Sequence, residues 1–129
     1  MIKYLLFFLL LLGLVACSSK DIGRDLTSWP DEQLIMAVKD QNTGRVDEEI
    51  VSEIRSRDIL PEEEWSYIRN GKVFIGMTED GLIATLGKPT KNSYINAWDG
   101  LKKDYTFING NARYKVKAKN GVVESLYRF

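Results

Sequence analysis

Few side chains in this sequence are suited to chemistry, and the most reactive of them is a single thiol. The 129 residues contain one cysteine, Cys17, and no histidine. Without histidine the chain cannot form a Ser-His-Asp triad, a Cys-His pair or a His-ligated metal site. One cysteine cannot form an internal disulfide, and a free thiol is a liability in an oxidising compartment. Acylation of Cys17 is a modification that would remove this liability.

Runs of carboxylates are the other groups that could act as acids or bases. Glu62–Glu64 follow Pro61, and Asp47–Glu49 stand at the start of another helical pattern. Acidic side chains in a first helical turn complement the helix dipole, so we interpret both runs as surface residues. The sequence has no calcium-loop spacing, and no motif pairs a serine with a lysine base. We therefore expect no enzyme activity, no cofactor and no small-molecule substrate.

The first 16 residues are typical of a secretory signal peptide. Lys3 follows the amino terminus, and Leu5–Ala16 contain no polar side chain. As a helix this run would reach about 18 Å, which is too short for a bilayer core of about 30 Å. We therefore expect residues 1–16 to be removed on export.

The run ends in Leu14-Val15-Ala16-Cys17, which resembles a bacterial lipobox. The resemblance implies cleavage between Ala16 and Cys17 and diacylglycerol on the Cys17 thiol, and acyl chains there would anchor the protein permanently. The alternative is an ordinary cleaved signal with an incidental cysteine. Ser18 resembles the residue that sorts lipoproteins to the outer membrane, so we expect an anchor on the periplasmic face of that membrane.

Behind the anchor, residues 17–28 are predicted to form the lipidated cysteine and a flexible tether. The mature chain of 113 residues is long enough for one domain with one core. Without Lys3, 17 basic residues face 18 acidic ones. There is no overall basic field, so nucleic acid is not an expected partner.

Four helical patterns precede the strands. Two of them, after Pro30 and over residues 47–57, form a helical extension at residues 29–58. The others follow Pro61 and the capping residue Thr78. Each pattern is too short to be stable alone and must pack on other elements. The apolar positions that face the predicted core are Leu34, Ile35, Val38, Ile50, Val51, Ile54, Trp65, Ile68, Leu82, Ile83 and Leu86.

Two Asn-Gly pairs predict two hairpins with two-residue type I′ turns. With Asn109-Gly110 as the first turn, Tyr105 lies opposite Tyr114. With Asn120-Gly121 as the second turn, Tyr114 lies opposite Tyr127. The two registers agree on a single apolar face, which contains Tyr105, Phe107, Tyr114, Val116, Ala118, Val123, Tyr127 and Phe129.

The opposite face of this predicted sheet is charged, with Leu126 as its exception. One apolar and one charged face are typical of an antiparallel sheet that is covered on one side. The predicted fold class is therefore α+β, with the N-terminal helices packed on one face of a three-stranded antiparallel meander. Residues 59–129 are predicted to form the domain that contains this meander and the helices next to it. Asn92–Trp98 is a candidate fourth, edge strand.

Two groups of residues are candidate contact sites. Tyr94 and Trp98 lie on the candidate edge strand and could anchor a partner protein, although Trp98 could instead close the end of the core. Lys115, Lys117 and Lys119 alternate on the charged face of the sheet. They could contact anionic lipid headgroups or an acidic partner, or they could be a solvated face that keeps the sheet soluble.

The stretch Trp65–Thr78, together with Leu86–Pro89, resembles the SmpA/OmlA (BamE-like) family of outer-membrane lipoproteins. The resemblance covers about residues 61–129. It implies two helices on a three-stranded antiparallel meander and an accessory role in outer-membrane assembly or integrity. Gly81 stands where the family usually has Gln or Glu, which removes a capping-box partner for Thr78.

Two hypotheses of function follow. In the first, the chain is a lipid-anchored envelope protein that acts by contact with another envelope protein. In the second, it is an envelope binding module, either inhibitor-like or specific for anionic lipid. An exposed aromatic cluster at one edge of the sheet would favour the binding of a partner.

Overall fold

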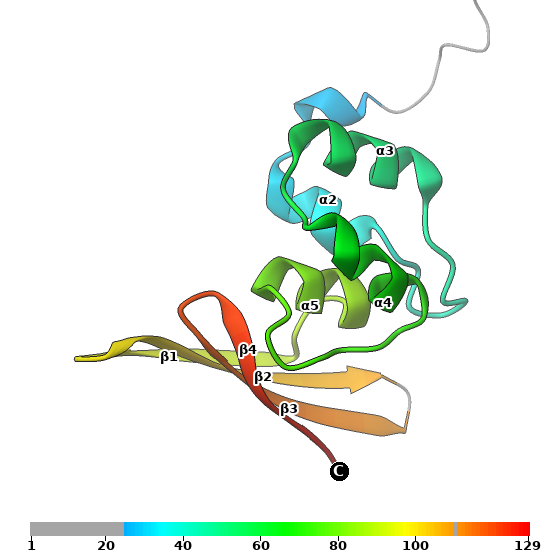
Figure 1. Ribbon diagram of the computed structural model, residues 1–129. Helices are drawn as coiled ribbons and strands as arrows, with labels where there is room; N and C mark the ends of the chain where they lie inside the picture. Colours follow the sequence, from blue (N-terminus) through cyan, green and yellow to red (C-terminus); the bar gives the residue numbers. More distant parts are fainter. Residues whose placement is uncertain (1–24, 110) are drawn as a thin grey trace, which may run out of the picture.

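The computed structural model describes residues 25–109 and 111–129 and has an α+β fold. The predicted signal peptide, Cys17 and residues 18–24 of the predicted tether lie outside these described residues. The elements, labelled in Figure 1 where there is room, are η1 (Leu26–Ser28), α2 (Asp31–Ala37), α3 (Glu48–Arg57), η2 (Glu62–Glu64), α4 (Trp65–Arg69), α5 (Glu79–Leu86), β1 (Lys91–Ala97), β2 (Gly100–Asn109), β3 (Ala112–Lys119) and β4 (Val122–Arg128). The predicted fold class is confirmed, and the candidate edge strand is a full member of the sheet as β1.

The helices begin and end where local chemistry directs them. Asp47 caps α3 by accepting hydrogen bonds from the backbone N–H groups of Glu49 and Ile50. The hydroxyl of Thr78 caps α5, and Gly87 ends it with a φ of +84°. The third predicted helix is divided into the 3-10 turn η2 and the short helix α4. The four predicted helical patterns are therefore present.

The folded domain begins before the predicted boundary at residue 29. Leu26–Ser28 form η1, and the side chain of Leu26 is buried. The guanidinium of Arg57 holds this segment by donating to the carbonyl oxygens of Leu26 at 2.9 Å and Trp29 at 2.6 Å. It also pairs with Asp31 at 2.9 Å. The buried side chain of Leu26 and the hydrogen bonds from Arg57 therefore order residues 26–28, which their polar composition had led us to assign to the tether.

The elements form a stack that ends in the sheet (Figure 1). α5 packs against the sheet at β4, α2 and α4 pack on α5, α3 packs on α2, and η1 packs on α3. The loop Gly76–Glu79 joins α5 to β4, because Gly76 donates to the carbonyl of Val123 at 2.8 Å and Val123 donates to Met77 at 2.7 Å. One core holds Leu26 at one end and Val123 at the other. The chain thus enters the domain at the end remote from the sheet.

The four strands are antiparallel in the order β1-β2-β3-β4. The predicted register of the β2–β3 hairpin is wrong by two residues. Asn109 pairs with Ala112 and Tyr105 pairs with Val116, so the pair 110–111 separates the strands. A shift of two residues keeps every side chain on its face, and Tyr105, Phe107 and Val116 are buried as predicted.

The β3–β4 hairpin has the predicted turn, but a bulge changes the strand beyond it. Asn120 and Gly121 have φ values of +53° and +86°, as a type I′ turn requires, and Ala118 pairs with Val123. A bulge between Lys117 and Ala118 shifts the register by one residue, so that Val116 pairs with Leu126.

This bulge exchanges the two faces of the end of β4. Leu126 packs against the core, whereas Tyr127 and Phe129 are 63% and 59% exposed. The prediction that Tyr127 and Phe129 lie on the buried face is therefore wrong. Leu126 was the apolar exception on the predicted charged face, and its presence there was the signal in the sequence that the strand changes faces at a bulge.

Glu64 is also placed differently from the prediction. Glu62 and Glu63 are exposed as expected, but Glu64 is only 2% exposed. Its carboxylate accepts from the backbone N–H of Thr78 at 3.1 Å and from the Thr78 hydroxyl at 2.6 Å, while Thr78 Oγ1 accepts from Gly81 at 3.0 Å. Glu64 thus supplies from η2 the carboxylate that a capping box takes from its own helix.

Candidate protein-interaction site

The β1–β2 hairpin stands clear of the helices and carries the largest exposed aromatic side chain. In Figure 1 the end of this hairpin extends beyond the helical stack. Trp98, at the turn, is 99% exposed, and Tyr94 and Ile95 on β1 are 71% and 65% exposed. The alternative in which Trp98 closes the core is therefore excluded. Both residues that the sequence selected as partner contacts lie on this hairpin, and Ile95 joins them.

The turn that presents Trp98 is braced from the neighbouring hairpin. Asp99 accepts from Nζ of Lys119 at 3.0 Å, and this hydrogen bond lowers the pKa of the Asp99 carboxyl below its ordinary value. Oδ1 of Asn120 accepts from the backbone N–H of Leu101 at 3.0 Å. Gly100, with a φ of +135°, lies so close that a Cβ there would be 2.3 Å from Asn120 Oδ1. Trp98 is thus an exposed side chain on a fixed backbone, and a fixed backbone lowers the ordering cost of binding.

A groove runs beneath β1, between the hairpin and helices α2 and α5. One part of it, about 250 Å³, is lined on its apolar side by Ile35, Met36, Ile83 and Pro89. A second hollow of about 280 Å³ continues it as far as Tyr94. The two hollows share Asn92, Lys103 and Tyr105 among their lining residues. We call this continuous feature the edge groove.

The rim of the edge groove is acidic. Glu32, Glu79 and Asp80 line it, and Lys103 is the one cation among the described residues that do so. Nζ of Lys103 donates to Glu79 at 3.2 Å, and this hydrogen bond raises the pKa of Lys103. Burial raises the pKa of Asp80, and the nearby Glu79 carboxylate raises it further. With Glu79 paired, Glu32 and Asp80 give the rim a negative charge.

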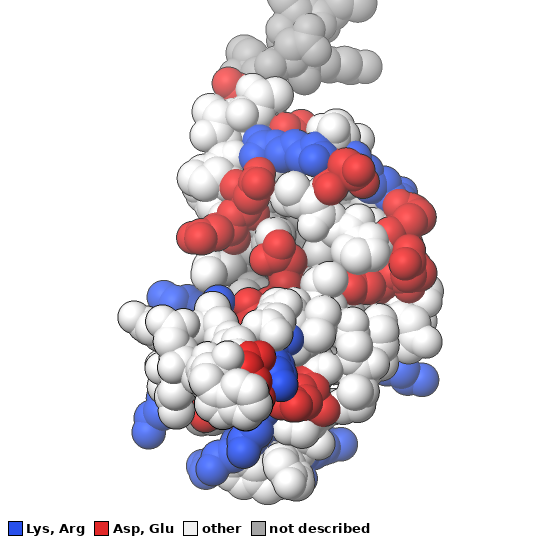
Figure 2. Space-filling view, turned by 60° about the vertical axis from the view of Figure 1, so that its left-hand side comes forward, with Lys and Arg blue, Asp and Glu red and all other residues white. Residues whose placement is uncertain are grey.

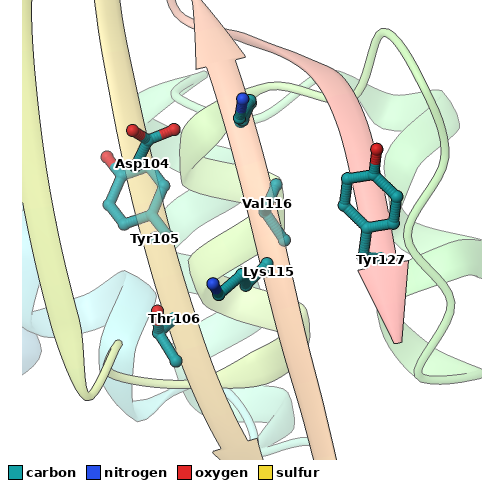
Figure 3. Close-up of a pocket in the computed structure, with 7 residues that line it drawn as sticks. Asp104, Tyr105, Thr106, Lys115, Val116 and Tyr127 are labelled. Carbon is teal, nitrogen blue, oxygen red and sulfur yellow. The ribbon is translucent and has the colours of Figure 1, made fainter. Parts of the chain in front are cut away.

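The three lysines predicted to contact an anionic surface lie on the face of the sheet away from the helices. Figure 3 views this face, with the helices behind the strands and Asp104, Lys115 and Tyr127 in front. A hollow of about 390 Å³ there is lined by Lys115, Lys117 and Tyr127 among others. Lys119 pairs with Asp99 instead. The structure therefore brings Lys115 and Lys117 together and assigns Lys119 to the braced turn.

Charge is divided between the two parts of the domain. Residues 25–86 carry 14 acidic and 6 basic side chains, a formal charge of −8, whereas residues 87–129 carry 3 acidic and 9 basic ones, a formal charge of +6. Figure 2 shows most of the acidic residues of its face over the helical part. The net charge of the whole chain is near zero and therefore does not show this separation, which becomes visible when the charges are counted for each part of the chain. The edge groove belongs to the acidic part, although strands β1 and β2 form one of its walls.

Sequence reasoning missed the edge groove and the brace at Asp99. The groove brings together α2, α5, β1 and β2, and no local pattern fixes the distance between helices and strands. The composition of β1 did contain a signal. Its sequence, Lys-Asn-Ser-Tyr-Ile-Asn-Ala, is mostly polar on both faces, which indicates a strand that neither face buries.

Comparisons of the chain with protein-family models, with curated proteins and with solved structures found no match. Among the helices of the described residues, none has the length and apolar composition needed to cross a membrane. Within the same residues, no group of three or more acidic, cysteine or histidine side chains is arranged to hold a metal ion. Function must therefore be inferred from the residues of the chain itself.

Proposed function

We propose that this chain is a lipid-anchored protein of the bacterial cell envelope that acts by binding another envelope protein, without a catalytic step. The observation that carries the proposal is the exposure of Trp98, which is 99% exposed on a braced turn of the hairpin that also carries Tyr94. Tryptophan and tyrosine are enriched among the residues that dominate binding energy at protein interfaces. A tryptophan side chain that is exposed in solvent stabilises no core, so a role in binding explains it better than a role in folding.

The position of the hairpin suits an anchored protein. Acylation of Cys17 is supported by the motif Leu14–Cys17, and Ser18 favours the periplasmic face of the outer membrane. Eight peptide steps from Cys17 to Asp25 span at most about 29 Å. Because η1 lies at the far end of the stack from the sheet (Figure 1), the hairpin is held away from the point of attachment. Anchoring also raises the effective concentration near membrane-bound partners.

The resemblance to the SmpA/OmlA family supports a more specific proposal. In that proposal the partner belongs to the machinery that assembles or maintains the outer membrane. The helical extension at residues 29–58, which the resemblance does not cover, shares one core with residues 59–129. It also contributes Glu32, Ile35 and Met36 to the edge groove, so it belongs to the surface through which a partner would dock.

A second candidate function is supported by the hollow that Lys115 and Lys117 line. Two lysines beside exposed Tyr127 and Phe129 suit an anionic lipid surface. On the β1–β2 hairpin, by contrast, Lys102 and Lys103 are paired with the carboxylates of Asp99 and Glu79. Replacing Lys115 and Lys117 by Gln should abolish binding to anionic vesicles under this second candidate and leave protein docking unchanged under the first.

The test of the main proposal is Trp98→Ala, compared with Ile75→Ala. Ile75 is a matched control, because it is an exposed apolar residue on a loop outside the hairpin. Thermal melts should leave both variants as stable as the wild type. Affinity purification from membranes of the native host should recover a partner with the wild type and with Ile75→Ala, and lose it with Trp98→Ala. Equal recovery with all three proteins would remove the hairpin from the proposal.

A further inference from the structure

Strand β1 has a free edge that the rest of the described chain does not cover. β1 is the first strand in the sheet order and pairs with β2 alone. No backbone hydrogen bond from the described loops reaches Lys91–Ala97. The other edge strand, β4, is partly covered, because Gly76 and Met77 pair with Val123. An open strand edge presents a row of backbone donors and acceptors to another chain.

Proteins usually protect such an edge, and β1 has little of this protection. A proline, a bulge or inward-pointing charges are the common devices. Within β1 there is no proline, its register with β2 is unbroken, and its only charged residue is Lys91 at one end. A strand left open in this way is suited to the addition of an extended segment from a partner.

The edge groove determines which side chains such a segment would carry. Alternate residues of an added strand point to opposite faces, so one set would enter the groove on the helix side of β1. There the lining is apolar at Met36 and Ile83, and the rim carries the carboxylates of Glu32 and Asp80. Arginine and lysine place an apolar stem on such a lining and a charged head at such a rim.

We infer that the edge groove binds an extended segment of the partner protein, in which basic residues alternate with apolar ones and which pairs as a strand with β1. The inference rests on the proposed function and specifies the chemistry of the partner. β1 has seven residues, so the bound segment extends over about 23 Å. Its basic side chains face Glu32 and Asp80, and its apolar side chains lie on the opposite face beside Ile95.

The probe for this inference is the labelled heptapeptide Arg-Val-Arg-Val-Arg-Val-Arg, added to the mature lipidated protein in detergent micelles. Two control peptides separate charge from strand pairing. In one, glutamate replaces arginine. In the other, alternate backbone nitrogens are methylated, which keeps the charge but removes hydrogen-bond donors along one edge. Fluorescence anisotropy should show saturable binding of the first peptide, no binding of the glutamate peptide and at least tenfold weaker binding of the methylated peptide.

The matched protein variants are Glu32→Gln/Asp80→Asn in the groove and Glu62→Gln/Glu63→Gln outside it, which change the net charge equally. The groove variant should weaken binding of the arginine peptide at least tenfold, and the control variant should change it less than twofold. Equal losses in both variants, equal affinity for the methylated peptide or no binding of the arginine peptide would overturn the inference. If Trp98→Ala loses the native partner but Glu32→Gln/Asp80→Asn retains it, docking by the hairpin stands and the groove inference fails.

Discussion

The carboxylate of Glu64 makes a specific prediction about Gly81. A glycine in a helix interior is ordinarily destabilising, and alanine in its place stabilises by about 0.5–1 kcal/mol. At Gly81 a Cβ would lie 2.2 Å from Oε1 of Glu64, well inside contact distance. The carboxylate would have to leave a position where it is buried and hydrogen-bonded to Thr78. Gly81→Ala should therefore destabilise the domain.

The size of this effect follows from the interactions that are displaced. A hydrogen bond to a charged group contributes about 1.5–3 kcal/mol. Loss of one such bond, offset by the helix propensity of alanine, leaves a net loss of about 1–2 kcal/mol. When Glu64 is first replaced by alanine, the methyl group that Gly81→Ala introduces meets no carboxylate, and its remaining close neighbour is Cγ of the flexible Met77 side chain at 3.2 Å. In that background the same change should stabilise by about 0.5–1 kcal/mol.

A double-mutant cycle tests this reversal of sign. The four proteins are the wild type, Glu64→Ala, Gly81→Ala and the double variant. Urea titrations can be followed by the fluorescence of Trp65, which is buried in the core. We expect a coupling free energy of about 1.5–3 kcal/mol between the two positions. If Gly81→Ala changes the free energy of unfolding equally in both backgrounds, the assignment of Glu64 as the missing capping partner is wrong.

Four further predictions follow from the same structure. Cys17→Ser should abolish membrane retention or block processing in cell fractionation, and a cleaved mutant that still fractionates with membranes would refute lipidation. Leu82→Ala should cost about 2–5 kcal/mol in denaturant melts because Leu82 is fully buried, and a loss below about 0.5 kcal/mol would contradict its place in the core. Arg57→Ala should release η1 and expose the hydrogen-bonded amide of Trp29 to hydrogen exchange, whereas Arg69→Ala should leave that amide protected. Lys119 holds the pKa of the Asp99 carboxyl below its ordinary value. The stability that this ion pair contributes should therefore be fully present at pH values above the ordinary pKa of Asp99, and it should be lost as the pH falls through the lowered pKa of the folded state. An NMR titration of the Asp99 carboxyl can check this.

Local signals in the sequence predicted most of the elements. Thr78 caps α5 as expected, because a side-chain oxygen beside free backbone N–H groups needs no distant partner. Asp47, expected only as an acidic residue at the start of its helix, caps α3 in the same way. Asn120-Gly121 forms its predicted turn for the same reason, since both residues adopt positive φ readily.

What the sequence could not determine depends on contacts between distant segments. The side-chain pattern of a strand has a period of two, so it cannot distinguish the predicted pairing of Tyr105 with Tyr114 from the observed pairing of Tyr105 with Val116. The bulge at Lys117 left its sign at Leu126, but only the packed core shows which residue is inserted. Burial of Glu64 follows from the approach of η2 to α5, and nothing in the run of three glutamates distinguishes the third from its neighbours.

The residues of the candidate site were likewise predicted only where local signals in the sequence were sufficient. Tyr94 and Trp98 were selected as aromatic residues on a weakly predicted edge strand, and both are exposed on the hairpin. The sequence could not show that Lys119 differs in role from Lys115 and Lys117, because the pairing of Lys119 with Asp99 joins residues that are 20 positions apart. The edge groove could not be predicted from the sequence, because it depends on how the helices are placed over the strands.

The most direct measurement of the central claim is photocrosslinking in intact cells of the native host. A benzoylphenylalanine is introduced in place of Trp98, and in a matched strain in place of the exposed Ile75. We predict that irradiation gives a discrete adduct with one envelope protein from position 98 and none from position 75, and mass spectrometry identifies the partner. Absence of any adduct at position 98, or the same adducts from both positions, would contradict docking through the β1–β2 hairpin.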